Sequence, residues 1–177
     1  MKSVKKMILA AMFLAIGLIL PFFTAQVKEI GDSLLPMHFP VMLCGLICGP
    51  WYGLSIGFIL PFFRSFLFSM PPVYPNAVWM AFELAAYGSV IGLLYQKSPN
   101  KNIGSVYFSL ITAMLFGRIV WGIAKTILLG IGGKTFGFQA FLAGGFFDAI
   151  PGIILQLILI PSIMILLQKN NRFMDNI

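Results

Sequence analysis

The sequence predicts an all-α integral membrane protein, a bundle of six transmembrane helices that forms one domain over residues 1–177. Hydrophobic residues make up 59% of the chain and charged residues 10%, whereas soluble domains are about 45–50% apolar and about 25% charged. The mean hydropathy is +0.95, and long apolar runs alternate with short polar breaks. Since a helix of about 20 apolar residues spans a bilayer, we expect the lipid bilayer to surround the chain.

The first apolar run covers 7–24 and follows three lysines within the first six residues. The same arrangement is typical of a signal peptide. However, this run ends in Pro21-Phe22-Phe23 rather than in the small residues of a cleavage site, and further apolar runs follow it. We therefore interpret 7–24 as the first transmembrane helix, followed by a polar loop at 25–34.

Two apolar arms, 36–48 and 52–70, are joined by the turn sequence GPWYG at 49–53. The first arm is short for a transmembrane helix, and Pro61 is expected to kink the second. His38, the only histidine, heads the first arm, and Arg64 lies within the second. An arginine at the bilayer centre costs about 2.5 kcal/mol or more, so we regard both side chains as candidates for ligand binding.

Three further helices are predicted over 76–95, 103–129 and 140–167. They are separated by a proline-rich loop at 71–75, the hydrophilic sequence KSPNKN at 97–102 and a glycine-rich segment at 130–138. Pro151 and Pro161 fall inside the last run, which we expect to form one helix.

Six helices place both termini on the same side of the membrane. On that side the loops and tails carry seven basic residues, and on the opposite side they carry two. Because cytoplasmic loops are enriched in Lys and Arg, we predict cytoplasmic N and C termini. This bias, and not binding to nucleic acid, accounts for the net charge of +7. The inner residues are Lys2, Lys5, Lys6, Lys97, Lys101, Lys169 and Arg172, and the outer ones are Lys28 and Lys134.

Polar side chains inside the apolar runs gather at one depth. At a rise of about 1.5 Å per residue, the charged ones all fall between the middle and the outer face of the bundle. Arg118, Trp121 and Lys125 also share one helix face, because they are spaced at i, i+3 and i+7. We predict an outward-facing substrate pocket between helices. Its candidate residues are His38, Arg64, Asn76, Trp79, Glu83, Tyr87, Arg118, Trp121, Lys125, Asp148 and Gln156.

The same charges also permit a purely structural interpretation, in which cations and carboxylates pair to hold the bundle together. Three cations, Arg64, Arg118 and Lys125, stand against two carboxylates, Glu83 and Asp148. Pairing leaves one positive charge over, and an anionic substrate group is a suitable partner for it. The sequence therefore favours an anionic ligand.

Motifs of enzymes and of metal sites are missing from the sequence. It contains no GxSxG, HExxH or Walker motif, and a single histidine excludes a multi-histidine metal site. Cys44 and Cys48 lie in an apolar run and are interpreted as small buried hydrophobic residues. We expect no enzymatic activity, no metal and no cofactor. Since the chain has no ATPase of its own, a transport function requires partner subunits.

The small residues Ala11 and Ala15, spaced at i and i+4 in the first helix, allow close approach of another helix. Together with six short spans, a basic N-terminus and polar residues in the outer half, they give the chain a family resemblance. It resembles the substrate-binding S components of energy-coupling factor (ECF) transporters. The run LPMHFPVMLCGLICGPWYGLSIGF at 35–58 carries the most specific part of the resemblance.

The resemblance implies a bacterial cell-membrane protein that binds a vitamin or its precursor from outside. It implies that the loop at about 25–35 closes over the substrate. It also implies assembly with a membrane coupling subunit and with two cytoplasmic ATPases, which hydrolyse the ATP. The coupling subunit would contact Ala11 and Ala15.

Pantothenate is the substrate that the sequence favours, because a positive pocket with Asn76, Tyr87 and Gln156 suits a small polar carboxylate. Riboflavin, folate, pyridoxine and a thiamine precursor are the alternatives within the family. A small secondary carrier that works alone is the alternative outside it.

Overall fold

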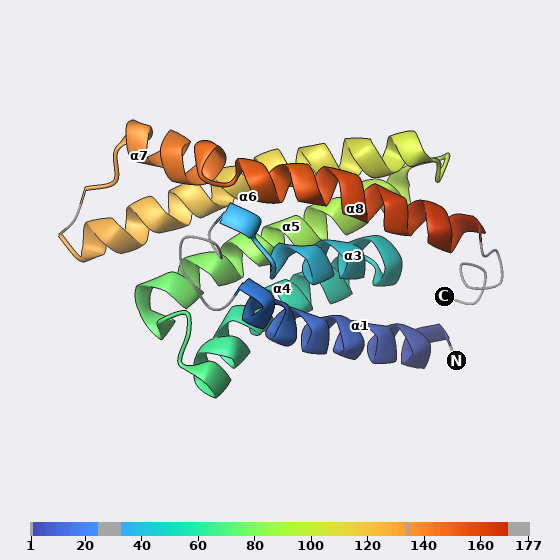
Figure 1. The fold of residues 1–177 in the computed structure, drawn as a ribbon, viewed down its shortest axis with the longest axis horizontal. Coiled ribbons are helices and arrows are strands. Elements are labelled where there is room, and N and C mark those ends of the chain that lie inside the picture. Colours follow the sequence, from blue (N-terminus) through green and yellow to red (C-terminus); the bar gives the residue numbers. More distant parts are fainter. Residues whose placement is uncertain (1, 25–32, 134, 170–177) are drawn as a thin grey trace.

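The computed structural model describes residues 2–24, 33–133 and 135–169. Every regular element in these ranges is a helix, which confirms the all-α prediction. Figure 1 shows the long helices lying roughly side by side, with the start of α1 (Lys2–Ile19) and the end of α8 (Ile150–Lys169) at the same end of the bundle. That end is called the terminal end below, and the other is called the distal end.

Five helices of the described residues are long and apolar enough to cross a membrane. A sixth, α3, has eleven residues and is too short to span a bilayer by itself. The elements are α1 (Lys2–Ile19), η1 (Leu20–Thr24), α3 (His38–Cys48), α4 (Pro50–Phe68), η2 (Val73–Ala77), α5 (Val78–Lys97), α6 (Ile103–Ile131), α7 (Phe138–Leu142), η3 (Ala143–Phe147) and α8 (Ile150–Lys169).

The short helix α3 is the core of the bundle. All eleven of its residues are buried, and α1, α4, α5 and α8 pack around it. Its end and the start of α4 form a tight corner at Gly49, whose φ of 108° is open to glycine but strained for other residues. Pro50 then starts α4 in the first helical position, where its missing N–H costs nothing.

Five glycines, here called the glycine seam, join α3, α4 and α5. A Cβ atom added at Gly53 or at Gly88 would overlap the backbone of the facing helix, and the other members are similarly crowded. Because small residues let helix backbones approach closely, the seam brings the backbones of these three helices into direct contact. The seam consists of Gly45, Gly53, Gly57, Gly88 and Gly92.

The prediction of one continuous helix over 140–167 is wrong. The segment contains α7, the π-helical turn η3, a turn at 148–149 and only then α8. Pro151 explains the break, because it has no N–H to donate to a carbonyl one turn earlier. Regular bonding is present again at Ile153, whose N–H donates to the Ala149 carbonyl at 2.9 Å.

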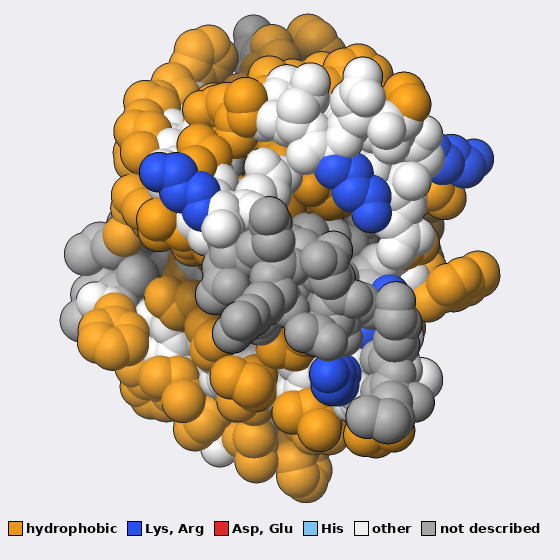
Figure 2. Space-filling view, turned by 90° about the vertical axis from the view of Figure 1, so that its right-hand side faces the viewer, with side chains coloured by type: hydrophobic (Ala, Val, Ile, Leu, Met, Phe, Trp, Pro, Cys, Tyr) orange, Lys and Arg blue, Asp and Glu red, His pale blue; other side chains and the backbone are white. Residues whose placement is uncertain are grey.

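Basic side chains gather at the terminal end. Figure 2 looks directly at this end and shows Lys and Arg side chains at several points, with no Asp or Glu side chain of the described residues in view. Lys5, Lys97, Lys101 and Lys169, which are exposed, belong to the helix ends and the loop found here. The arrangement is the one that cytoplasmic termini require, and the membrane orientation stays a prediction.

Candidate functional site

Three buried polar side chains from three helices meet in the middle of the bundle. His38 on α3 places Nε2 3.2 Å from Oε1 of Glu83 on α5, and Arg118 on α6 donates from Nη1 to the same oxygen at 2.9 Å. Exposure is 2% for His38 and Glu83 and 4% for Arg118. These residues are called the buried triad below. Since α3 starts at His38, its first residue is held where α5 and α6 face each other.

The partner of His38 indicates which of its ring nitrogens donates a hydrogen bond. Glu83 accepts from Arg118, as an ionised carboxylate does, so His38 Nε2 must carry the hydrogen of the His38–Glu83 bond. The triad therefore contains one full ion pair and one imidazole whose second nitrogen points elsewhere.

Gln156 on α8 lies at the same depth as the triad. Counted from the terminal end, Glu83, Arg118 and Gln156 are 14, 15 and 13 residues into their helices, which corresponds to about 20–22 Å. Gly152, Gln156 and Ile160 are spaced by four residues and are all buried, so Gln156 lies on the inward face of α8. A Cβ at Gly152 would meet the carbonyl oxygen of Ser33 at 2.5 Å, so the chain entering α3 crosses one turn distal to Gln156.

Several polar atoms at this depth have no hydrogen-bond partner among the described residues. They are Nε and Nη2 of Arg118, Nε2 of Gln156 and Nδ1 of His38. A buried donor or acceptor without a partner costs about 1–3 kcal/mol. Nε and Nη2 lie on one edge of the guanidinium, the edge that binds a carboxylate with two parallel bonds. We call these four atoms the unpaired set; their chemistry suits a ligand rich in oxygen atoms.

Aromatic rings surround the cations on the distal side of the triad. The Trp121 ring centroid lies 5.8 Å from Cζ of Arg118 and 4.4 Å from Nζ of Lys125. Trp79 and Phe136 also face Nζ, at 5.2 and 4.8 Å. The i, i+3, i+7 spacing on α6 thus produces one continuous row of alternating cation and ring.

Tyr87 completes the wall beside the triad. Its ring meets His38 edge-on with centroids 5.0 Å apart. Gly117 on α6 makes room for it, because a Cβ there would lie 2.6 Å from the ring. Asn76, in η2, is half-buried and lies distal to this layer.

Arg64 and Asp148 lie apart from the triad, although the sequence placed them in the same pocket. Arg64 donates from Nη1 to the Leu18 carbonyl at 2.7 Å and is flanked by the rings of Phe22 and Phe68. It therefore fastens the end of α1 to α4. Asp148 is exposed at the turn before α8. The break at Pro151 takes it out of the inward face on which a continuous helix would have placed it. The assignment of the site residues to ligand binding stays a prediction.

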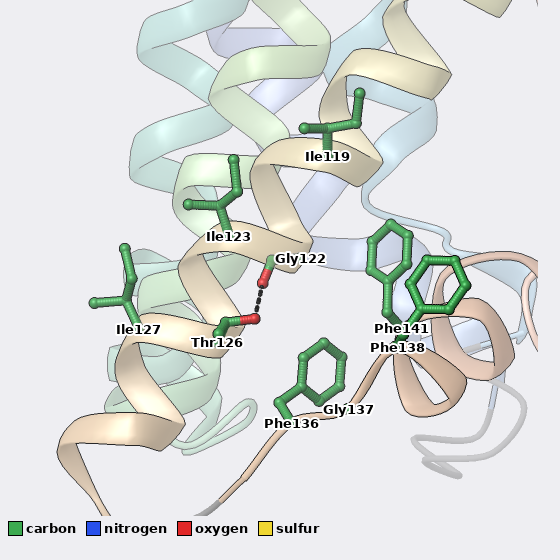
Figure 3. Close-up of a pocket in the computed structure, with 9 residues that line it drawn as sticks. All are labelled: Ile119, Gly122, Ile123, Thr126, Ile127, Phe136, Gly137, Phe138 and Phe141. Atoms are coloured by element: carbon green, nitrogen blue, oxygen red, sulfur yellow. Dashed lines mark hydrogen bonds between the residues drawn. The ribbon is translucent and has the colours of Figure 1, made fainter.

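An apolar hollow of about 550 Å³ lies next to the cation and ring row, between α6 and the chain leading into α7. Figure 3 shows Phe136, Phe138 and Phe141 on one side and the α6 residues on the other, with Thr126 Oγ1 donating to the Gly122 carbonyl at 2.8 Å. Phe136 and Phe141 are neighbours of Trp121 that were not predicted from the sequence. The signal was present in the phenylalanine-rich sequence FGFQAFLAGGFF at 136–147.

The predicted partner face lies on α1. Ala11 and Ala15 are both exposed, and together with larger apolar residues they form an outward stripe. Its larger members are Val4, Met7, Ile8, Met12, Ile16 and Ile19. The loop expected to close over the substrate falls mostly at 25–32, which lies outside the described residues.

The described residues contain no group of three His, Cys, Asp or Glu side chains that could hold a metal ion. A family model described as "ECF transporter, substrate-specific component" matches residues 5–164. No curated protein and no solved structure matches the chain.

Proposed function

Because the chain belongs to the family of ECF transporter substrate-specific components, we propose that it binds a small vitamin that carries a carboxylate, and that this vitamin is pantothenate. Membership makes the chain a membrane-embedded transport component that serves a small-molecule substrate and works with an ECF module. The identity of the vitamin, the residues that bind it and the subunits that join it are our proposal.

The observation that carries the proposal is the unpaired set. The Nε and Nη2 edge of Arg118 is buried and has no partner in the described part of the chain, and this edge matches a carboxylate in shape and charge. Glu83 occupies only Nη1 of Arg118. A substrate carboxylate would supply the acceptors that the buried Nε and Nη2 lack.

The rest of the set argues for oxygen-bearing groups beyond the carboxylate. Gln156 offers an amide N–H, and Nδ1 of His38 is a second buried polar atom without a partner in the described chain. Pantothenate has one carboxylate, an amide carbonyl and two hydroxyl groups, which complement this combination. Riboflavin and pyridoxine have no carboxylate, and folate has two carboxylates on a much larger frame.

The transport arrangement follows the family. We propose that the exposed α1 stripe with Ala11 and Ala15 contacts the membrane coupling subunit, and that two cytoplasmic ATPase subunits hydrolyse the ATP. In a bacterial cell membrane with cytoplasmic termini, the distal end of the bundle faces outward. The substrate then enters from the distal end.

A binding panel tests the proposal. The purified chain in lipid nanodiscs is titrated with radiolabelled pantothenate, riboflavin, folate and pyridoxine. We expect saturable binding of pantothenate alone. Saturable binding of another member of the panel, or of none, would overturn the choice of pantothenate.

Two variants on α6 locate the site. Arg118→Lys keeps the charge but loses the two-bond edge, and we expect it to weaken pantothenate binding by about tenfold or more. Ser109→Ala is the matched control, because Ser109 is equally buried and also lacks a partner in the described chain. It lies nine residues, or about 13 Å, nearer the terminal end, so its loss should leave the affinity unchanged. Equal effects of the two variants would argue against a site at Arg118.

A further inference from the structure

An apolar stripe runs along the exposed side of α6. Its members recur every four residues and are all 48% to 75% exposed: Ile111, Leu115, Ile119, Ile123, Ile127 and Ile131. The stripe lies within Ile103–Ile131, one of the helices long and apolar enough to cross a membrane, so lipid covers it in a bilayer. Ile119, Ile123 and Ile127 also line the apolar hollow. The hollow is therefore continuous with the lipid-facing surface of α6.

The side chains of the hollow suit hydrocarbon rather than water. Of the described residues that line it, Thr126 alone has a polar side chain, and its hydroxyl donates to the Gly122 carbonyl at 2.8 Å. A buried water needs about two to four polar partners, whereas a cavity of about 150 Å³ lined by Leu, Ile and Phe stays dry and binds benzene. At about 550 Å³, the hollow has room for a much larger hydrocarbon than benzene.

Two rings that line the hollow also pack against Trp121. They are Phe136 and Phe141 (Figure 3), whose centroids lie 5.7 and 6.1 Å from that of Trp121. Gly122 makes room for Phe141, because a Cβ there would lie 2.5 Å from its ring. Trp121 itself is only 7% exposed. An occupant of the hollow therefore lies one layer of rings away from a tryptophan that has little contact with the surface.

We propose that the hollow binds one acyl chain of a phospholipid from the leaflet at the distal end. Its continuity with the lipid-facing stripe identifies the occupant, and its apolar lining matches that occupant. Because lipid chains are as apolar as the side chains around them, packing drives the binding; walls that face a void lose their dispersion contacts. The bound chain packs against Phe136 and Phe141 and holds these rings beside Trp121. The site does not depend on which small molecule the protein transports.

Quenching by brominated lipid measures contact between the acyl chain and the surroundings of Trp121. The chain has three tryptophans, so Trp51→Phe with Trp79→Phe leaves Trp121 as the single fluorophore. This full-length background is placed in nanodiscs of a phospholipid brominated at mid-chain, and in nanodiscs of the same lipid without bromine. We expect the brominated lipid to quench Trp121 despite its low exposure.

A filled variant adds Ile123→Phe and Thr126→Phe to this background. The larger side chains take up space in the hollow and exclude hydrocarbon, so quenching by brominated lipid should fall about twofold or more. The matched control carries Ile111→Phe and Thr126→Val. Ile111→Phe adds a ring to the same stripe about 18 Å from Ile123 along the helix, and Thr126→Val removes the hydroxyl without filling the hollow. The control should keep the quenching of the background.

Thermal unfolding checks that each variant is folded. If the filled variant does not fold, Ile123→Phe alone replaces it, and a smaller fall in quenching is expected. Failure of brominated lipid to quench Trp121, or equal quenching in the filled variant and the control, would overturn the lipid site.

Two further measurements identify other occupants of the hollow. Acrylamide is a quencher dissolved in water; if filling the hollow lowers quenching by acrylamide and leaves quenching by lipid unchanged, the hollow holds water. If added pantothenate abolishes quenching by brominated lipid, the hollow holds the substrate. Either result would refute the acyl-chain site.

Discussion

The buried triad provides a test that separates a structural role from a binding role. Glu83→Met removes the carboxylate and leaves Arg118 with a charge that is only 4% exposed. Removing one partner of a buried ion pair costs about 3–5 kcal/mol. Arg118→Met leaves the Glu83 carboxylate with only His38 as a described partner, so we expect a loss of similar size.

The double variant, Glu83→Met with Arg118→Met, should be more stable than either single variant. Replacing a whole buried ion pair by apolar side chains of similar volume is often neutral or stabilising. Thermal unfolding in detergent measures the difference. At about 2–4 °C per kcal/mol for a chain of this size, each single variant should unfold about 6–20 °C below the parent chain. The double variant should unfold within a few degrees of the parent.

Pantothenate binding by the double variant then shows whether the triad has a structural role or a binding role. We expect the double variant to be folded and to show no saturable pantothenate binding, because the two-bond edge of Arg118 is gone. If the double variant is less stable than both single variants, the ion pair is not a self-contained unit and the energetic reasoning is wrong. If the double variant binds pantothenate normally, the triad is structural and the site lies elsewhere.

Three further outcomes follow from the packing. Gly88→Ala should lower the free energy of unfolding by about 1–3 kcal/mol, because its Cβ overlaps the α4 backbone; Gly130→Ala, which meets nothing within 4 Å, is the control in the same unfolding assay. Arg64→Met should lower thermal stability, since it loses a charged hydrogen bond of about 1.5–3 kcal/mol, with pantothenate affinity unchanged in the nanodisc titration. Leu at both Ala11 and Ala15 should leave that affinity unchanged but abolish uptake in cells that also produce the ECF module. Uptake at the parent rate would exclude this face as the contact.

The helical architecture could be predicted from the sequence because lipid exposure imposes long apolar runs. The same reasoning identified 36–48 as unusually short. The sequence did not show why this helix is short. The structure shows that α3 is enclosed by other helices and forms the core of the bundle. A helix that is apolar all round gives the same pattern whether lipid or protein surrounds it.

The close packing at the glycine seam could have been predicted from the sequence, but it was not. Gly53 and Gly57, like Gly88 and Gly92, are spaced by four residues, which is the pattern that favours close helix packing. The sequence analysis applied this rule only to Ala11 and Ala15. Those two residues are exposed, so a small-residue pattern alone does not reveal whether its helix partner is in the same chain.

The depth of the polar residues was predictable, but their pairing was not. A rise of about 1.5 Å per residue places Arg64 and Arg118 at nearly the same depth, 14 and 15 residues from the terminal ends of α4 and α6. Only Arg118 meets Glu83, because α6 packs against α5 on the side where Glu83 lies. Counting charges could not show which arginine pairs with Glu83, because the sequence allows either arginine to pair with either carboxylate.

The glycine seam and the buried triad lie at adjacent levels of the bundle. Gly88 lies five residues nearer the terminal end than Glu83, and Gly45 lies seven residues nearer that end than His38. The buried triad thus lies on the distal side of the level at which the backbones of α3, α4 and α5 touch. His38 and Glu83 are therefore carried by helices whose backbones are in direct contact one level away.

The helix that carries Arg118, α6, packs through a different kind of contact. Gly117 and Gly122 on α6 meet rings, those of Tyr87 and Phe141, and not backbone. Rings can rotate and shift where backbone contacts cannot, so these two contacts of α6 are more adjustable than the backbone contacts of the seam. A ligand bound between the two sides would meet a fixed His38–Glu83 pair on one side. On the other side it would meet Arg118, which α6 carries.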